Sequence, residues 1–261
     1  RTISSAASDV YKRQMQMVYQ KRLPDAVTVK SGPIEEIASF LLLVDETVRN
    51  RGIRLTVRTD IDALQELNRR ETAAGNWYPL FPIFDPAHDR VDASNAYWIS
   101  GVNERDETVV AQAGRIFYWP ETSLAEEMAG VLYPGKADYT PFHVTCPSAH
   151  GVSGTVCFSG STWFHPDYRR LGLSRILPRV SRVYAYSQFE TDWTISMVKR
   201  ELIELNIAVA YGYTDTQFGI WAPGHPLGDL DLALVRMPRS ELLSDLRHFI
   251  VERQAASRKT A

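Results

Sequence analysis

The chain has 261 residues, 44% of them hydrophobic and 23% charged, which excludes disorder throughout and provides enough apolar surface for a sizeable core. Its 29 basic and 31 acidic residues leave a formal net charge of −2, so no global field draws it to nucleic acid or to anionic lipid. Apolar runs such as residues 40–44 fall far short of the ~18 residues that span a bilayer, so we expect neither a nucleic-acid partner nor a membrane protein.

The first residues and the two cysteines set the expected start and compartment. Residues 1–14 resemble translated adapter sequence, so we treat them as a non-native, disordered tail and expect the true start at Met15 or Met17. Cys146 and Cys157 have no metal-ligand spacing and are too few for a disulfide framework. We therefore expect a cytoplasmic protein with reduced thiols, no metal and no cysteine nucleophile.

Residues 15–52 are interpreted as an N-terminal extension that carries one helix. Apolar side chains recur at helical spacing from Ile34 to Val48, a proline at position 33 precedes them, and Gly52 provides a stop. The alternation in residues 53–58 then predicts a half-buried strand, and Thr59 or Asp60 can cap a following helix that carries apolar residues 61, 64 and 67.

The middle of the chain predicts a loop, a hairpin and an insertion. Three prolines among aromatic residues indicate a long loop over 76–95, and strands over 97–102 and 108–119 are joined by a polar turn. Residues 120–151 predict a short helix over 123–132 and then an irregular, proline-rich insertion.

The last third alternates strands and helices. We expect a strand over 152–164 with a bulge at 159–161, followed by a helix that begins near Leu173. Pro178 would kink this helix unless it lies in the first turns. The remaining elements expected are a strand over 193–198, a helix over 199–213, strands over 218–221 and 230–237, and a terminal helix over 240–254. Residues 53–238 form the predicted main domain, and residues 239–261 a C-terminal helix and tail.

One turn between a strand and a helix has the composition of an anion site. The first amides of a helix lack internal partners, and Gly172 permits a positive φ and a close approach of a ligand. Arg169, Arg170 and Arg175 add cations around the turn. Spacing alone also fits an α/β protein that binds no ligand here, so both interpretations remain open at this level.

The run Phe-His-Pro-Asp-Tyr-Arg-Arg-Leu-Gly-Leu-Ser at 164–174 resembles the acetyl-coenzyme A signature of the GNAT N-acetyltransferases, Arg/Gln-x-x-Gly-x-Gly/Ala after a strand and an x-Pro. Arg169, Gly172 and Ser174 occupy the three motif positions, with serine in place of the usual glycine or alanine. A weaker downstream match comprises Asn206, Val209, Tyr213 and Phe218, with glutamine at 217 where the family has glycine.

The resemblance implies an α+β fold with a mixed sheet, to which this chain adds an N-terminal helix, the 120–151 insertion and a C-terminal helix. It assigns Tyr213 as the donor to the departing thiolate. Residues 162–165 would pair with the pantetheine arm, and the turn would hold the pyrophosphate. The positions implied to contact the cofactor are Thr162, Trp163, Phe164, His165, Arg169, Arg170, Leu171, Gly172, Leu173, Ser174, Arg175 and Asn206.

The implied activity is transfer of an acetyl or other acyl group from acyl-coenzyme A to an amine of a small molecule or peptide, without a metal. The resemblance is also compatible with a homodimer. Three alternatives stay open: a non-catalytic coenzyme A or metabolite binder, a transferase for a larger acyl or aminoacyl group, and a nucleotide-phosphate binder. The last lacks a Gly-x-x-x-x-Gly-Lys-Ser/Thr or Gly-x-Gly-x-x-Gly pattern. The general base is left unassigned: a water chain could serve, or one of the side chains Glu104, Glu107, Glu121, His143, Glu190 and Asp192.

Overall fold

The computed structural model describes residues 22–135 and 142–260, the last five of these by backbone alone. The predicted tail 1–14, the candidate starts Met15 and Met17 and part of the 120–151 insertion therefore lie outside the described residues. Within the described ranges, no helix is both long and apolar enough to cross a membrane.

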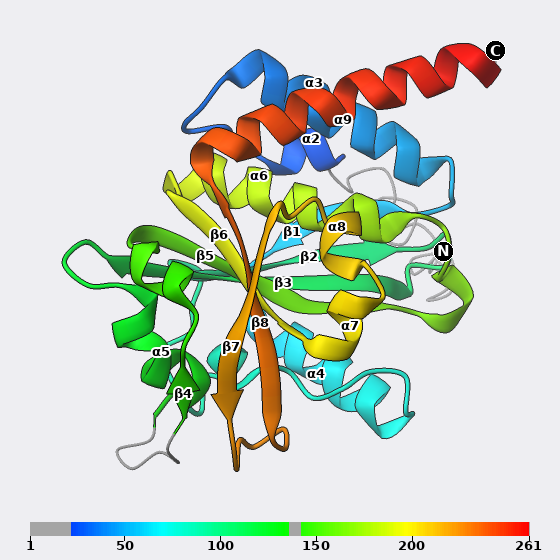
Figure 1. Cartoon of the computed structure of the whole chain (residues 1–261). Helices are drawn as coiled ribbons and strands as arrows, with labels where there is room; N and C mark the ends of the chain where they lie inside the picture. Colours follow the sequence, from blue (N-terminus) through cyan, green and yellow to red (C-terminus); the bar gives the residue numbers. More distant parts are fainter. Residues whose placement is uncertain (1–21, 136–141, 261) are drawn as a thin grey trace.

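A single mixed sheet organises the described chain, with strands in the order β1-β2-β3-β5-β6-β8-β7-β4 (Figure 1). All neighbouring strands are antiparallel except β5 and β6, which are parallel. The strands are β1 (Arg54–Arg58), β2 (Ala96–Val102), β3 (Thr108–Trp119), β4 (His143–Val144), β5 (Gly154–Phe164), β6 (Trp193–Lys199), β7 (Asp215–Ala222) and β8 (Leu230–Pro238). This mixed sheet with helices confirms the expected fold class.

Helices cover both faces of the sheet, and each face has its own core. The helices are α2 (Leu23–Ala26), α3 (Ile34–Arg49), α4 (Ile61–Ala73), α5 (Leu124–Leu132), α6 (Leu177–Phe189), α7 (Arg200–Glu204), α8 (Ile207–Ala210) and α9 (Arg239–Thr260). In Figure 1, α2, α3, α6 and α9 lie above the sheet, and α4 and α5 lie below it. The side chains of β2 alternate between the two cores, with Tyr97 and Ile99 in the upper one and Trp98 in the lower one.

Most elements agree with the sequence pattern because their signals are local. The helix α3 spans nearly the predicted range, and α5 begins with a capping box between Ser123 and Glu126. A register shift of β5 against β3 falls beside Ser161, whose φ of 50° gives the predicted bulge. Pro178 occupies the first turn of α6, where a missing N–H costs nothing.

Three local expectations are wrong. The segment 199–213 is not one helix but two short ones, because Asn206 adopts a left-handed conformation (φ 57°) between them. Asp60 is the N-cap of α4, but its carboxylate accepts hydrogen bonds from Arg58 and Trp98 instead of capping the helix. The helix expected from Leu173 begins at Leu177, after a separate 3-10 turn over Leu173–Arg175.

Candidate functional site

A gap opens in the middle of the sheet where β5 and β6 separate. The two strands pair only from Val156 opposite Trp193 to Phe158 opposite Ile195. β5 then continues along β3 to Phe164, while β6 continues along β8 to Lys199. The bulge at Ser161 bends β5 in the same stretch, since the extra residue increases the local twist. Beyond Phe158, the backbone of β5 therefore has no strand partner on its β6 side among the described residues.

The backbone of Thr162 and Phe164 faces this gap. The amide of His165 donates to the Val109 carbonyl at 2.8 Å, so His165 and, by alternation, Trp163 direct their backbone groups toward β3. Thr162 and Phe164 point the other way. The Phe164 carbonyl already accepts a hydrogen bond from Arg169 Nε at 3.2 Å, so at Phe164 the backbone N–H is the group that remains to pair with a ligand.

The turn after β5 presents a row of unpaired amides. Tyr168 and Arg169 donate to the carbonyls of His165 and Pro166, and Arg175 donates to that of Gly172. Between them, the amides of residues 170–174 donate no hydrogen bond within the described part of the chain. Arg170 and Gly172 have φ values of 64° and 70°, which turn the backbone sharply on either side of Leu171.

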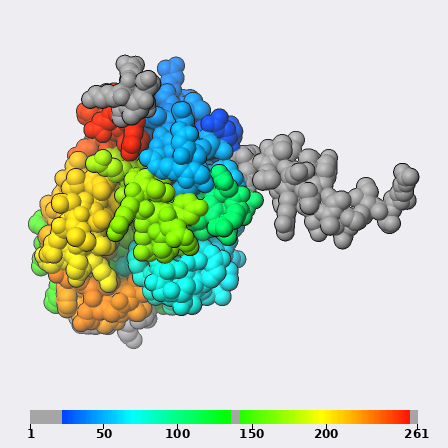
Figure 2. Space-filling view, turned by 90° about the vertical axis from the view of Figure 1, so that its right-hand side faces the viewer, coloured from blue at the N-terminus to red at the C-terminus, as the bar shows by residue number. Residues whose placement is uncertain are grey.

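This turn is exposed on the protein surface. Figure 2 shows the yellow-green segment around residue 170 at the surface, between the yellow segment of α7 and α8 and the cyan segment of α4. A Cβ built on Gly172 would meet nothing within 4 Å, so the space above the turn is open. Leu173 is buried and Leu171 partly buried, and their side chains anchor the turn to the upper core. Ser174 is half-buried.

The three predicted arginines differ in what they contact. Arg169 braces the turn, because its Nε and Nη2 donate to the carbonyls of Phe164 and Asn76, both at 3.2 Å. Arg170 and Arg175 are exposed and form no ion pair with a described residue. These two guanidinium groups are thus available to an anion at the turn.

The side chains of His165 and Trp163, which precede the turn, contact other protein groups. The His165 ring accepts a hydrogen bond from the Asp167 amide at 3.3 Å, and the Trp163 ring stacks on Trp77 with 5.3 Å between ring centroids. Trp163 is 3% exposed and its side chain packs in the lower core, while its backbone pairs with β3.

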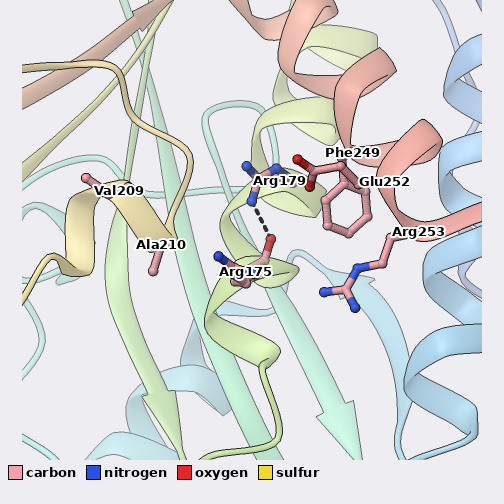
Figure 3. A pocket seen from close by; sticks show the side chains of 7 residues that line it. All are labelled: Arg175, Arg179, Val209, Ala210, Phe249, Glu252 and Arg253. Carbon is pink, nitrogen blue, oxygen red and sulfur yellow. Dashed lines mark hydrogen bonds between the residues drawn. The ribbon is translucent and has the colours of Figure 1, made fainter. Parts of the chain in front are cut away.

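A cavity of about 320 Å³ lies next to the turn, between the start of α6, α8 and α9 (Figure 3). Figure 3 shows the Arg175 carbonyl accepting a hydrogen bond from Arg179 Nη1, which measures 2.7 Å. The cavity is lined by Arg175, Arg179, Val209, Ala210, Phe249, Glu252 and Arg253. Six of these seven residues are not among the predicted cofactor contacts, and those on α9 reach the site only through tertiary packing.

The structure places Tyr213 in the upper core with 5% of its surface exposed. Burial raises the pKa of Tyr213 to about 12, and Arg182, whose guanidinium carbon lies 5.0 Å from the ring centroid, opposes the rise. Tyr211 is half-buried; burial raises its pKa, and the Thr162 side chain opposes that rise. Tyr211 therefore lies beside a residue whose backbone faces the gap. Asn206 is exposed at the left-handed junction of α7 and α8.

Several carboxylates considered for the base are engaged elsewhere. Asp192 accepts from the Thr155 amide at 2.9 Å and pairs with Arg239 at 2.8 Å. Glu190 accepts from Ser31, and Asn103 and Arg105 hold Glu107. Glu104, Glu121 and His143 are exposed. No group of three or more His, Cys, Asp or Glu side chains in the described ranges is placed to hold a metal ion.

No protein-family model matches the chain, and no curated protein matches it either. Among solved structures, NAA60 of Arabidopsis thaliana in complex with acetyl-CoA is similar at 12% identity and a TM-score of 0.46, over 72% of this chain and 99% of that one. Spermidine N-acetyltransferase of Vibrio cholerae is similar at 10% identity and a TM-score of 0.41, over 72% and 95% of the two chains. A putative acetyltransferase of Acinetobacter baylyi is similar at 15% identity and a TM-score of 0.40, over 71% and 91%.

Proposed function

We propose that this chain binds an acyl-coenzyme A and transfers the acyl group to an amine by direct attack. The observation that carries the proposal is the row of unpaired amides at residues 170–174, flanked by Arg170 and Arg175 and adjoining the gap between β5 and β6. Unpaired amides with neighbouring guanidinium groups suit a diphosphate, because each contact is a charge-assisted hydrogen bond. The open space above Gly172 leaves room for it.

The gap beside β5 suits an extended chain with amide groups, which is the chemistry of the pantetheine arm. The N–H and C=O of Thr162 and the N–H of Phe164 would pair with such an arm in the manner of an added strand. Arg169 would act indirectly, since its bonds to the Phe164 and Asn76 carbonyls hold the strand end and the turn together. The turn amides, the flanking arginines, the free backbone of β5 and Arg169 thereby have separate roles in one continuous site.

In the reaction, the lone pair of a neutral amine attacks the thioester carbonyl, the carbon–sulfur bond breaks, and the thiolate takes up a proton. The sequence resemblance points to Tyr213 as the proton donor, whereas the contact between Tyr211 and Thr162 favours Tyr211. Both phenols keep their protons at neutral pH, because burial raises the pKa of each. The matched variants Tyr211→Phe and Tyr213→Phe decide between them. Loss of the proton donor lowers kcat by about 10²-fold or more and leaves KM for acyl-coenzyme A nearly unchanged.

The proposal is tested by free-thiol release from acetyl-coenzyme A with a panel of small-molecule and peptide amines. Activity should disappear in Gly172→Glu with Arg175→Glu, which places two negative charges at the turn, and should persist in Gly228→Glu. Gly228 is a suitable control because it also has a positive φ (88°) and open space around its Cβ, but lies in the turn between β7 and β8.

Calorimetric titration of the native chain separates the remaining alternatives. Binding of coenzyme A without thiol release from any donor–amine pair would indicate a non-catalytic binding protein. A preference for longer acyl donors in titration would indicate a transferase for larger groups. Equal affinity of the native chain and the doubly substituted turn variant for acetyl-coenzyme A would refute the site.

A further inference from the structure

The C-terminal helix α9 forms one wall of the cavity beside the turn, and several contacts fix its position. Arg179 donates two hydrogen bonds to Asp245 of α9, at 2.9 and 2.7 Å, and Arg247 pairs with Glu36 of α3 at 2.9 Å. The buried Phe249 packs edge-on against Phe40, with 5.7 Å between ring centroids. The next turn of α9, with Glu252 and Arg253, is therefore held over the start of α6 (Figure 3).

Positive charge is concentrated in this cavity. Arg175, Arg179 and Arg253 line it against a single carboxylate, that of Glu252. Asp245 compensates Arg179, but Arg175 has no carboxylate partner among the described residues. Burial lowers the pKa of Arg253, as do the neighbouring guanidinium groups of Arg51, Arg175 and Arg179, and Glu252 acts in the opposite direction. A bound anion would relieve this repulsion.

The cavity continues directly from the turn. Arg175 ends the 3-10 turn that follows Gly172 and is also part of the cavity wall. A volume of about 320 Å³ is ample for a phosphorylated sugar, and Val209 and Ala210 of α8 supply an apolar side. A ligand whose diphosphate occupies the turn would extend its nucleotide end toward α9.

We propose that Arg253 of α9, together with Arg175, binds the phosphomonoester on the ribose of the coenzyme's nucleotide, so that this chain prefers coenzyme A to 3′-dephospho-coenzyme A. This inference rests on the proposed function and adds a specificity determinant contributed by the C-terminal helix. Each guanidinium would contribute charge-assisted hydrogen bonds to a dianion in a partly enclosed site.

The test is calorimetric titration of the native chain with coenzyme A and with 3′-dephospho-coenzyme A, repeated on Arg253→Gln and on the control Arg69→Gln, which changes an exposed arginine of α4 that does not line the cavity. We expect the native chain and the control to bind coenzyme A about tenfold or more tightly than the dephospho form. In Arg253→Gln this ratio should shrink severalfold, through weaker binding of coenzyme A with little change for the dephospho form. Arg175→Gln should weaken binding of both ligands, because Arg175 also flanks the diphosphate turn, and should weaken binding of coenzyme A more. Thermal unfolding of each variant verifies that it is folded.

The outcomes separate the two proposals. If the native chain binds both ligands equally, the ribose-phosphate site is refuted and the acyltransferase proposal stands. If Arg253→Gln keeps the native ratio of affinities for the two ligands, Arg253 of α9 does not bind the phosphate. If neither ligand binds the native chain, the proposed function fails, and this inference fails with it.

Discussion

The turn at Gly172 permits a prediction in which stability and ligand affinity separate. Gly172 has φ 70° and ψ 16°, a left-handed conformation that costs an alanine about 1 kcal/mol. For a chain of this size, that cost lowers the unfolding midpoint by roughly 2–4 °C. Because an added Cβ meets no protein atom within 4 Å, the substitution Gly172→Ala should leave the rest of the fold intact.

The same Cβ would occupy open space within the turn whose amides, at residues 170–174, are unpaired and would contact a diphosphate. Loss of one charge-assisted hydrogen bond of ~1.5–3 kcal/mol weakens the Kd about tenfold or more. Thermal unfolding and titration with acetyl-coenzyme A measure the two effects separately. The control Gly228→Ala, at φ 88° with an equally open Cβ, should lose a similar amount of stability. Its affinity for acetyl-coenzyme A should stay at the native value. Native affinity in Gly172→Ala, or an equal loss of affinity in both variants, would contradict this reasoning.

Three further predictions concern the core. Asp45→Ala should lower the free energy of unfolding in urea by about 2 kcal/mol, because the fully buried carboxylate accepts hydrogen bonds from Arg22, Arg49 and the Leu23 amide. An unchanged urea midpoint would show that α2 does not depend on this carboxylate. Stability should fall as the pH rises from about 10 to 12, because the pKa of Tyr213 is raised to about 12 and the neutral phenol is favoured in the fold; Tyr213→Phe should flatten this fall. Both buried cysteines should resist a thiol reagent at pH 8 until urea unfolds the chain, since burial also raises the pKa of Cys157 to about 12; rapid labelling of the native chain would contradict this.

The tertiary structure changed the interpretation of several predicted site residues. Arg169 fits the sequence motif, but its guanidinium bonds to the carbonyl of Asn76, a residue 93 positions away along the chain. Tyr213 fits the downstream pattern, but it lies in the core, whereas Tyr211 contacts Thr162 at the strand gap. A motif gives the order of residues, whereas the partner of each side chain depends on which segments pack together.

The sequence by itself determined most strands and helices and the turn at 165–175, since alternation, helical spacing, capping residues and glycine act over a few neighbouring positions. It did not determine the break at Asn206, an exposed residue whose left-handed conformation interrupts the helical pattern. Only the tertiary structure decided where β5 leaves β6 and that Arg179 reaches Asp245 66 positions away, which brings α9 to the cavity. Contacts between distant segments form only when the whole core packs, and the local spacing of apolar residues does not predict them.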